Sequence, residues 1–100
     1  MKFNLAQFEP LVGAAFDVHT SHGALPLTLA AAQEYPRRGL PDHLPTPLSL
    51  IFDGPPGVLL AHDNYLIAHP DIGEAVLNIM PVMPGGGAPP DRPQYQILIA

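Results

Sequence analysis

The sequence predicts an all-β domain of about six antiparallel strands, closed as a small barrel or folded as a sandwich, with a short N-terminal helix. Apolar and polar residues alternate with a period of two in several short segments, which is typical of strands with one face in water. The 14 prolines and 9 glycines gather between these segments and indicate turns. A chain of 100 residues has the size of one domain, so residues 1–100 are interpreted as a single β domain.

A helix is predicted only at the start of the chain, within residues 3–12. Asn4 is a suitable N-cap, and Gln7 stands where a capping box requires it. Pro10 and Gly13 predict that the helix lasts only one or two turns. Four apolar residues share one helix face and are expected to cover one end of the β core: Leu5, Phe8, Leu11 and Val12.

Six later segments carry strand signals. Pro26 is expected at a sheet edge or near the beginning of its strand, because proline cannot donate to a ladder. Residues 76–82 are apolar on both faces apart from Asn78, and this segment is predicted to be the most buried strand. The proline-rich residues 36–47 and the Pro/Gly-rich residues 84–93 are predicted to be loops. The expected strands are residues 16–19, 25–31, 48–52, 65–68, 76–82 and 94–100.

The charge balance excludes some classes of partner. The net charge is −5 with only four lysines and arginines, so neither nucleic acid nor an anionic membrane is expected to bind. The chain has no cysteine, which excludes disulfides, cysteine-ligated zinc and cysteine nucleophiles. Residues 1–20 lack a signal-peptide pattern, and no apolar run approaches the roughly 20 residues that span a bilayer. A cytoplasmic location is therefore expected.

Histidines next to carboxylates are the residues that metal binding would use. His19 and His22 lie close to Asp17, but on a strand the two imidazoles would point to opposite faces. Side chains at a hairpin tip explain this spacing better, and no metal is predicted. The glycines of residues 84–90 lack the Lys-Ser/Thr of a phosphate loop, so no cofactor is expected either.

The same residue types also suggest a hydrolase, which the sequence does not support. His62 and His69 each lie near an aspartate, yet neither Ser21 nor Ser49 stands in a nucleophile motif. His69 is better explained as a turn residue whose ring packs on a neighbour or bonds a backbone carbonyl. The carboxylates considered for a catalytic pair are interpreted as solvated turn residues: Asp53, Asp63, Asp71 and Glu74. The protein is therefore predicted not to be an enzyme.

The order of several short motifs resembles a bacterial family of small domains of unknown function. These motifs are LAQFEPLVG near the start, LSLIFDGPP, YLIAHPDIGE, LNIMPVMP and the final YQILIA. The resemblance covers nearly the whole chain, and its motifs mark turns and core positions. It implies a location near genes for phage-tail-collar-like proteins, and one departure is the GGGAPP stretch at residues 85–90.

The predicted partner-binding loop combines an aromatic residue, two arginines and stiff prolines, which are residue types that interface centres favour. Its candidate residues are Tyr35, Arg37, Arg38 and Leu40. The apolar last segment, residues 94–100, is expected either to pair inside the sheet or to offer an edge to a partner or a second copy.

Two functions are compatible with these features. The first is a non-enzymatic protein-interaction or structural module that binds a protein partner or associates with itself. The family resemblance suggests that such a module is accessory to a phage-tail-like or collar-like protein. The alternative is a small barrel that binds an apolar or sugar-like molecule in its mouth, lined by Tyr35, Tyr65 or Tyr95.

Overall fold

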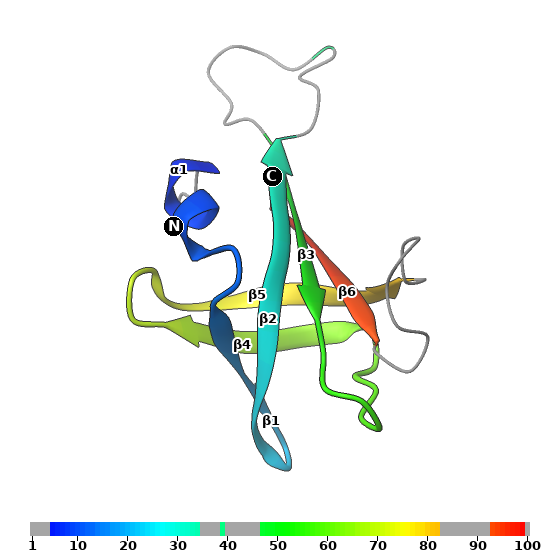
Figure 1. Cartoon of the computed structure of the whole chain (residues 1–100). Helices are drawn as coiled ribbons and strands as arrows, with labels where there is room; N and C mark the ends of the chain where they lie inside the picture. The colour runs from blue at the N-terminus through cyan, green and yellow to red at the C-terminus, as the bar shows by residue number, and fades with distance from the viewer. Residues whose placement is uncertain (1–4, 35–38, 40–46, 83–92, 100) are drawn as a thin grey trace.

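The computed structural model describes residues 5–34, 39, 47–82 and 93–99 (Figure 1). Its N-terminal element is α1 (Leu5–Phe8), which continues into the 3-10 turn η1 (Glu9–Leu11). The strands that follow are β1 (Ala15–Thr20), β2 (Gly23–Glu34), β3 (Leu48–Asp53), β4 (Asp63–His69), β5 (Gly73–Val82) and β6 (Gln94–Ile99).

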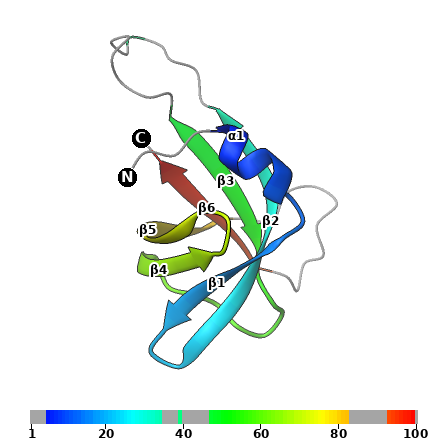
Figure 2. The ribbon, with the colours of Figure 1, turned by 90° about the vertical axis from the view of Figure 1, so that its left-hand side faces the viewer.

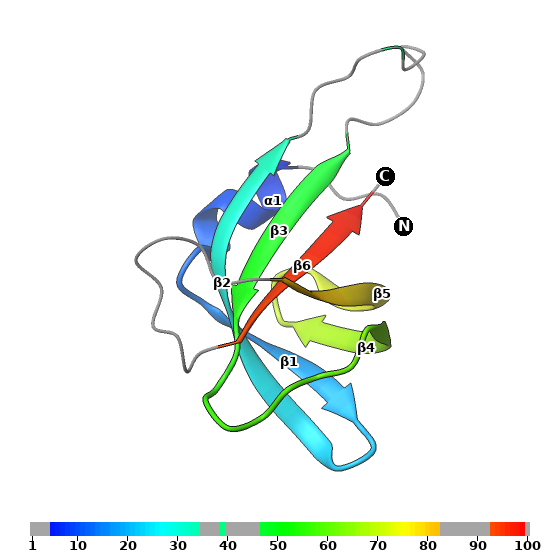
Figure 3. The same ribbon diagram turned by 90° about the vertical axis from the view of Figure 1, so that its right-hand side faces the viewer.

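The six strands form a closed barrel in the order β1-β2-β3-β6-β5-β4, and every pairing is antiparallel. The prediction of antiparallel strands is confirmed, and the barrel is the correct one of the two architectures. β2 and β5 are long strands that pair with one neighbour at each end, which lets the sheet curl on itself (Figure 3). β1 and β4 close the barrel through three residue pairs, from Asp17↔Ala68 to His19↔Leu66.

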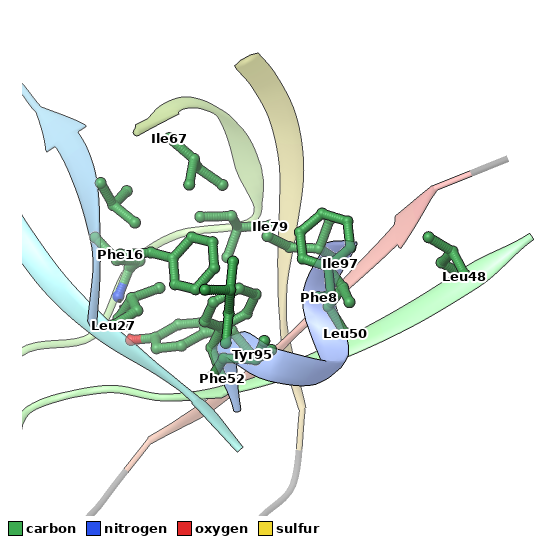
Figure 4. Packing of buried hydrophobic residues seen from close by; sticks show 14 residues of the cluster. Phe8, Phe16, Leu27, Leu48, Leu50, Phe52, Ile67, Ile79, Tyr95 and Ile97 are labelled. Atoms are coloured by element: carbon green, nitrogen blue, oxygen red, sulfur yellow. Dashed lines mark hydrogen bonds between the residues drawn. The ribbon is translucent and has the colours of Figure 1, made fainter. Parts of the chain in front are cut away.

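Buried apolar side chains from all six strands and the N-terminal turn pack together in the core. A cluster of 14 buried apolar residues includes Phe16 and Phe52, whose rings meet edge to face with centroids 5.2 Å apart (Figure 4). Tyr95 lies fully buried beside them. A Cβ at Gly54 would stand 2.8 Å from the Tyr95 ring, so the end of β3 needs a glycine for this close approach.

Three of the four apolar residues predicted on one face of the N-terminal helix pack against the core. Phe8 and Leu11 are buried and Leu5 packs against the core, but Val12 is 49% exposed, so its prediction was wrong. The physical reason is that the backbone of Val12 is extended, with φ −60° and ψ 126°, and leaves the helix face. Pro10 lies in the 3-10 turn that begins at Glu9, and Gly13 has the predicted left-handed φ of 94°.

The second strand differs from its prediction near its end. The register shifts between Leu29 and Ala31 where β2 meets β3, which is a β-bulge. The bulge turns Ala31 outward and lets Ala32 pack against the core, so the expected alternation ends one residue early. Pro26 lies in the part of β2 that pairs with β1 alone, as expected for a residue near a strand beginning.

The most buried strand is β3 and not β5. Only Ile79 of β5 is buried, whereas four of the six residues of β3 are buried. β3 is paired with β2 and β6 along its whole length, while each part of β5 has a neighbour on one side only. On the outer face of β5, the apolar side chain of Val76 is 66% exposed.

The last strand and the two predicted loops have different outcomes. The last strand pairs inside the barrel, between β3 and β5, as the first of its two alternatives required. The predicted loops at residues 36–47 and 84–93 lie outside the described residues, apart from Gly39, Pro47 and Pro93. Within the described part of the chain, no helix has the length and apolar character needed to cross a bilayer.

Candidate functional site

A groove of about 690 Å³ lies between the β1–β2 hairpin and the segment that leads into β4. We call it the hairpin groove. It is lined by residues 19–25 on one side and by residues 58–61 and 63–65 on the other.

The groove exists because two paired strands diverge. The ladder between β1 and β4 stops at His19↔Leu66, although β1 runs on to Thr20 and β4 begins at Asp63. The β1–β2 hairpin therefore projects beyond the barrel, and its side becomes one wall of the groove (Figure 1).

The tip of the hairpin is held by local hydrogen bonds. The Thr20 hydroxyl donates to the Gly23 carbonyl at 2.7 Å and accepts from the His22 amide at 3.1 Å. Gly23 has a φ of 109°, a left-handed value that suits glycine. These contacts define the shape of this wall.

The opposite wall is the segment 58–61, which two tyrosine hydroxyls anchor. Tyr95 accepts a hydrogen bond from the Leu60 amide at 2.9 Å, and Tyr65 donates to the Ala61 carbonyl at 2.9 Å. Leu60 is thereby buried, but its neighbour Leu59 is 73% exposed. An anchored backbone thus presents a large apolar side chain to solvent.

Two of the described histidines, His62 and His69, contact neighbouring residues. His69 accepts a hydrogen bond from the Asp71 amide at 3.0 Å and packs on Phe16 with ring centroids 4.7 Å apart. The predicted packing of the His69 ring on a neighbour is confirmed, but His69 ends strand β4, and its backbone partner is an amide and not a carbonyl. His62 donates to Asn78 at 2.9 Å on the barrel surface.

Ser49 lies within the sheet. Ser49 is buried in mid-strand, where its hydroxyl accepts from Gln96 at 3.0 Å. Among the described residues, no three or more histidine, aspartate or glutamate side chains come together as a metal site would require.

The residues singled out from the sequence have three different outcomes. Tyr35, Arg37, Arg38 and Leu40 lie outside the described residues, so the predicted partner-binding loop stays a prediction. Tyr65 lines the hairpin groove, and the ligand hypothesis that named it stays a prediction. Tyr95 is 0% exposed and faces the core, so the prediction that it lines a mouth was wrong.

Sequence reasoning missed the exposed apolar residues Val58 and Leu59. Their signal is the apolar run that follows the turn at residues 54–57, which has no strand alternation. An apolar run of this kind outside a strand indicates that some of its side chains are not buried in the core.

The sequence matches the family model described as a domain of unknown function, DUF6916, over residues 3–99. The match spans almost the entire chain, and the chain belongs to this family. No curated protein and no solved structure matches it.

Proposed function

We propose that this member of the DUF6916 family is a non-enzymatic protein-interaction module that holds an apolar segment of another protein in the hairpin groove. The observation that carries the proposal is Leu59, which is 73% exposed on a backbone that Tyr65 and Tyr95 anchor. Large apolar side chains on an ordered surface cost little entropy to bury and are typical of binding sites.

The groove adds a polar rim to this apolar wall. Val58 is 44% exposed beside Leu59, and Leu25 contributes from the hairpin. His19 and Asp63 supply polar groups at the same groove. An apolar centre with polar groups around it is the common layout of protein interfaces.

Affinity capture with matched variants tests this proposal. We expect the full chain to capture a stoichiometric partner from its host's lysate, and Leu59→Ser to lose it. Leu98→Ser is the control, because Leu98 is also exposed, at 53%, but lies on β6 outside the groove. A partner retained equally by all three proteins would contradict the groove as its site.

We further propose that the captured partner is a phage-tail-like or collar-like protein, which the sequence resemblance supports. Mass spectrometry of the same captured material identifies it. Recovery of a stoichiometric partner of another kind would contradict this identity while leaving the groove proposal intact. A cytoplasmic site of action stays a prediction from the sequence.

The volume of the groove supports a second candidate function, the binding of an apolar or sugar-like small molecule. Small-molecule sites commonly have volumes of roughly 300–1,000 Å³, and the groove holds about 690 Å³. Tyr65 offers a ring on which a sugar face can pack. A thermal-shift screen would show a raised Tm for a true ligand, with the rise lost in Tyr65→Ala. A screen without any such rise would favour the protein partner.

A further inference from the structure

The outer surface of β1, β4 and β5 is a sheet face on which the described chain places no covering element. The three strands lie side by side with β4 in the middle (Figure 2). The alternate residues Val18, Ile67 and Ala75 pack into the core, so the residues between them point outward. We call the outward set the β4 face, and it consists of Asp17, His19, Leu66, Ala68, Glu74 and Val76.

The middle of the β4 face is apolar. Leu66 stands opposite His19 on one side and opposite Val76 on the other. Val76 is 66% exposed, although a β-branched side chain in mid-strand is usually part of a packed surface. This row therefore offers an aliphatic contact to a second molecule.

The next row along β4 is acidic. Ala68 stands opposite Asp17 and Glu74, and both carboxylates are exposed. The usual spacing of strands puts the Cα atoms of Asp17 and Glu74 about 10 Å apart. Because Ala68 is short, a hollow of about 330 Å³ lies here, lined also by His69, Pro70 and Gly73. Two carboxylates thus flank a hollow that Ala68 helps to line.

Charge decides what fits this hollow. The described residues contain no lysine or arginine, and the net charge of the whole chain is −5. A cationic partner is complementary to this face, whereas a second copy of the chain is repelled by it. Arginine suits the hollow best, because its long stem covers apolar surface and its planar fork bonds carboxylates.

We propose that the β4 face docks an extended segment of another protein that carries an arginine and, two residues further along, an aliphatic residue. Ala68 and Leu66 are two residues apart on β4, which is about 6.6 Å in a strand. Residues i and i+2 of an extended partner have the same spacing and point the same way. The proposal goes beyond the hairpin groove, since only His19 belongs to both surfaces.

The test is an NMR titration of the full chain with an acetylated and amidated peptide, Ser-Arg-Thr-Ile-Ser. We expect the largest amide shifts on β4 and on the facing residues Asp17, Glu74 and Val76. The double variant Asp17→Asn/Glu74→Gln should bind the peptide about tenfold more weakly, a typical loss for charge-assisted hydrogen bonds. The matched control is Glu9→Gln/Glu34→Gln, which removes the same charge from exposed positions off this face and should bind as the wild type does.

Three outcomes would overturn the proposal. If both double variants bind the peptide equally weakly, the peptide is attracted by the net charge alone. If a peptide with citrulline in place of arginine binds as well as the original peptide, the guanidinium has no role. Self-association of the wild type that Asp17→Asn/Glu74→Gln abolishes would assign the face to a second copy. Leu59→Ser should leave peptide binding unchanged, so failure here is distinguishable from failure of the groove proposal.

Discussion

Strands β3 and β5 are both rich in apolar residues, yet most residues of β3 are buried and most residues of β5 are not. In β3, Leu48, Leu50 and Phe52 are at most 1% exposed, and even the outward Ser49 is buried. In β5, only Ile79 is buried, and Val76 is 66% exposed. Apolar character in a strand therefore indicates either core or contact surface, and the neighbouring strands decide which.

The difference follows from pairing. β3 has β2 and β6 on its two sides over its full length, and its outer face carries the hydrogen bond from Gln96 to Ser49. β5 changes partner along its length, from β4 over residues 73–79 to β6 over residues 80–82. No second layer covers it among the described residues, so Val76 on its outer face is exposed to solvent.

The largest expected effect is the loss of a core side chain from β3. Leu50→Ala should lower the free energy of unfolding by about 2–5 kcal/mol, because it removes buried methyl groups and leaves a cavity. Val76→Ala in β5 should change it by no more than about 0.5 kcal/mol. Urea denaturation monitored by circular dichroism measures both values. Similar losses for the two variants would refute the contrast between these strands.

A smaller effect is expected at the anchors of the groove wall. Tyr95→Phe should cost about 1–3 kcal/mol, because it leaves the buried Leu60 amide without its acceptor. Tyr65→Phe should cost less than about 0.5 kcal/mol, since water can replace its exposed contact with Ala61.

Hydrogen exchange separates the two anchors further. The Leu60 amide should exchange faster in Tyr95→Phe than in the wild type, whereas Tyr65→Phe should leave its exchange unchanged. Unchanged protection of Leu60 in Tyr95→Phe would mean that the buried tyrosine does not hold this segment.

The smallest effect on stability is expected on the outer face of β5. Val76→Ser should change the free energy of unfolding by less than about 0.5 kcal/mol, because the side chain is already exposed. Binding of the arginine-containing peptide should nevertheless weaken about threefold to fivefold, since aliphatic contact area is lost. Comparing denaturation with NMR titration of the same variant checks both. A large loss of stability would place Val76 in the core.

Local patterns allowed much of the fold to be predicted, and the errors occur where distant segments meet. The alternation around Phe16 and Phe52 predicted their strands and their burial correctly. Ala31 was misplaced because the bulge that turns it outward depends on how β2 meets β3. Val12 was misplaced because its backbone leaves the helix to enter β1.

The candidate sites were less accessible to sequence reasoning than the fold. The hairpin groove joins residues 19–25 to residues 58–65, and the β4 face joins three strands. Nothing in the local pattern gives the register that sets Ala68 between Asp17 and Glu74. Tyr65 was singled out for its residue type, but Leu59 was not, because exposure of an apolar residue depends on what packs on it.

By itself, the sequence determined the strand periodicity, the turn positions, the absence of cysteine and a net charge of −5. These properties depend on each residue and its near neighbours. Only the tertiary structure decided that the sheet closes as a barrel, that β1 and β4 diverge to open a groove, and that Val76 of β5 faces solvent. The reason is that pairing partners and registers are set by the packing of the whole chain, which no short segment encodes.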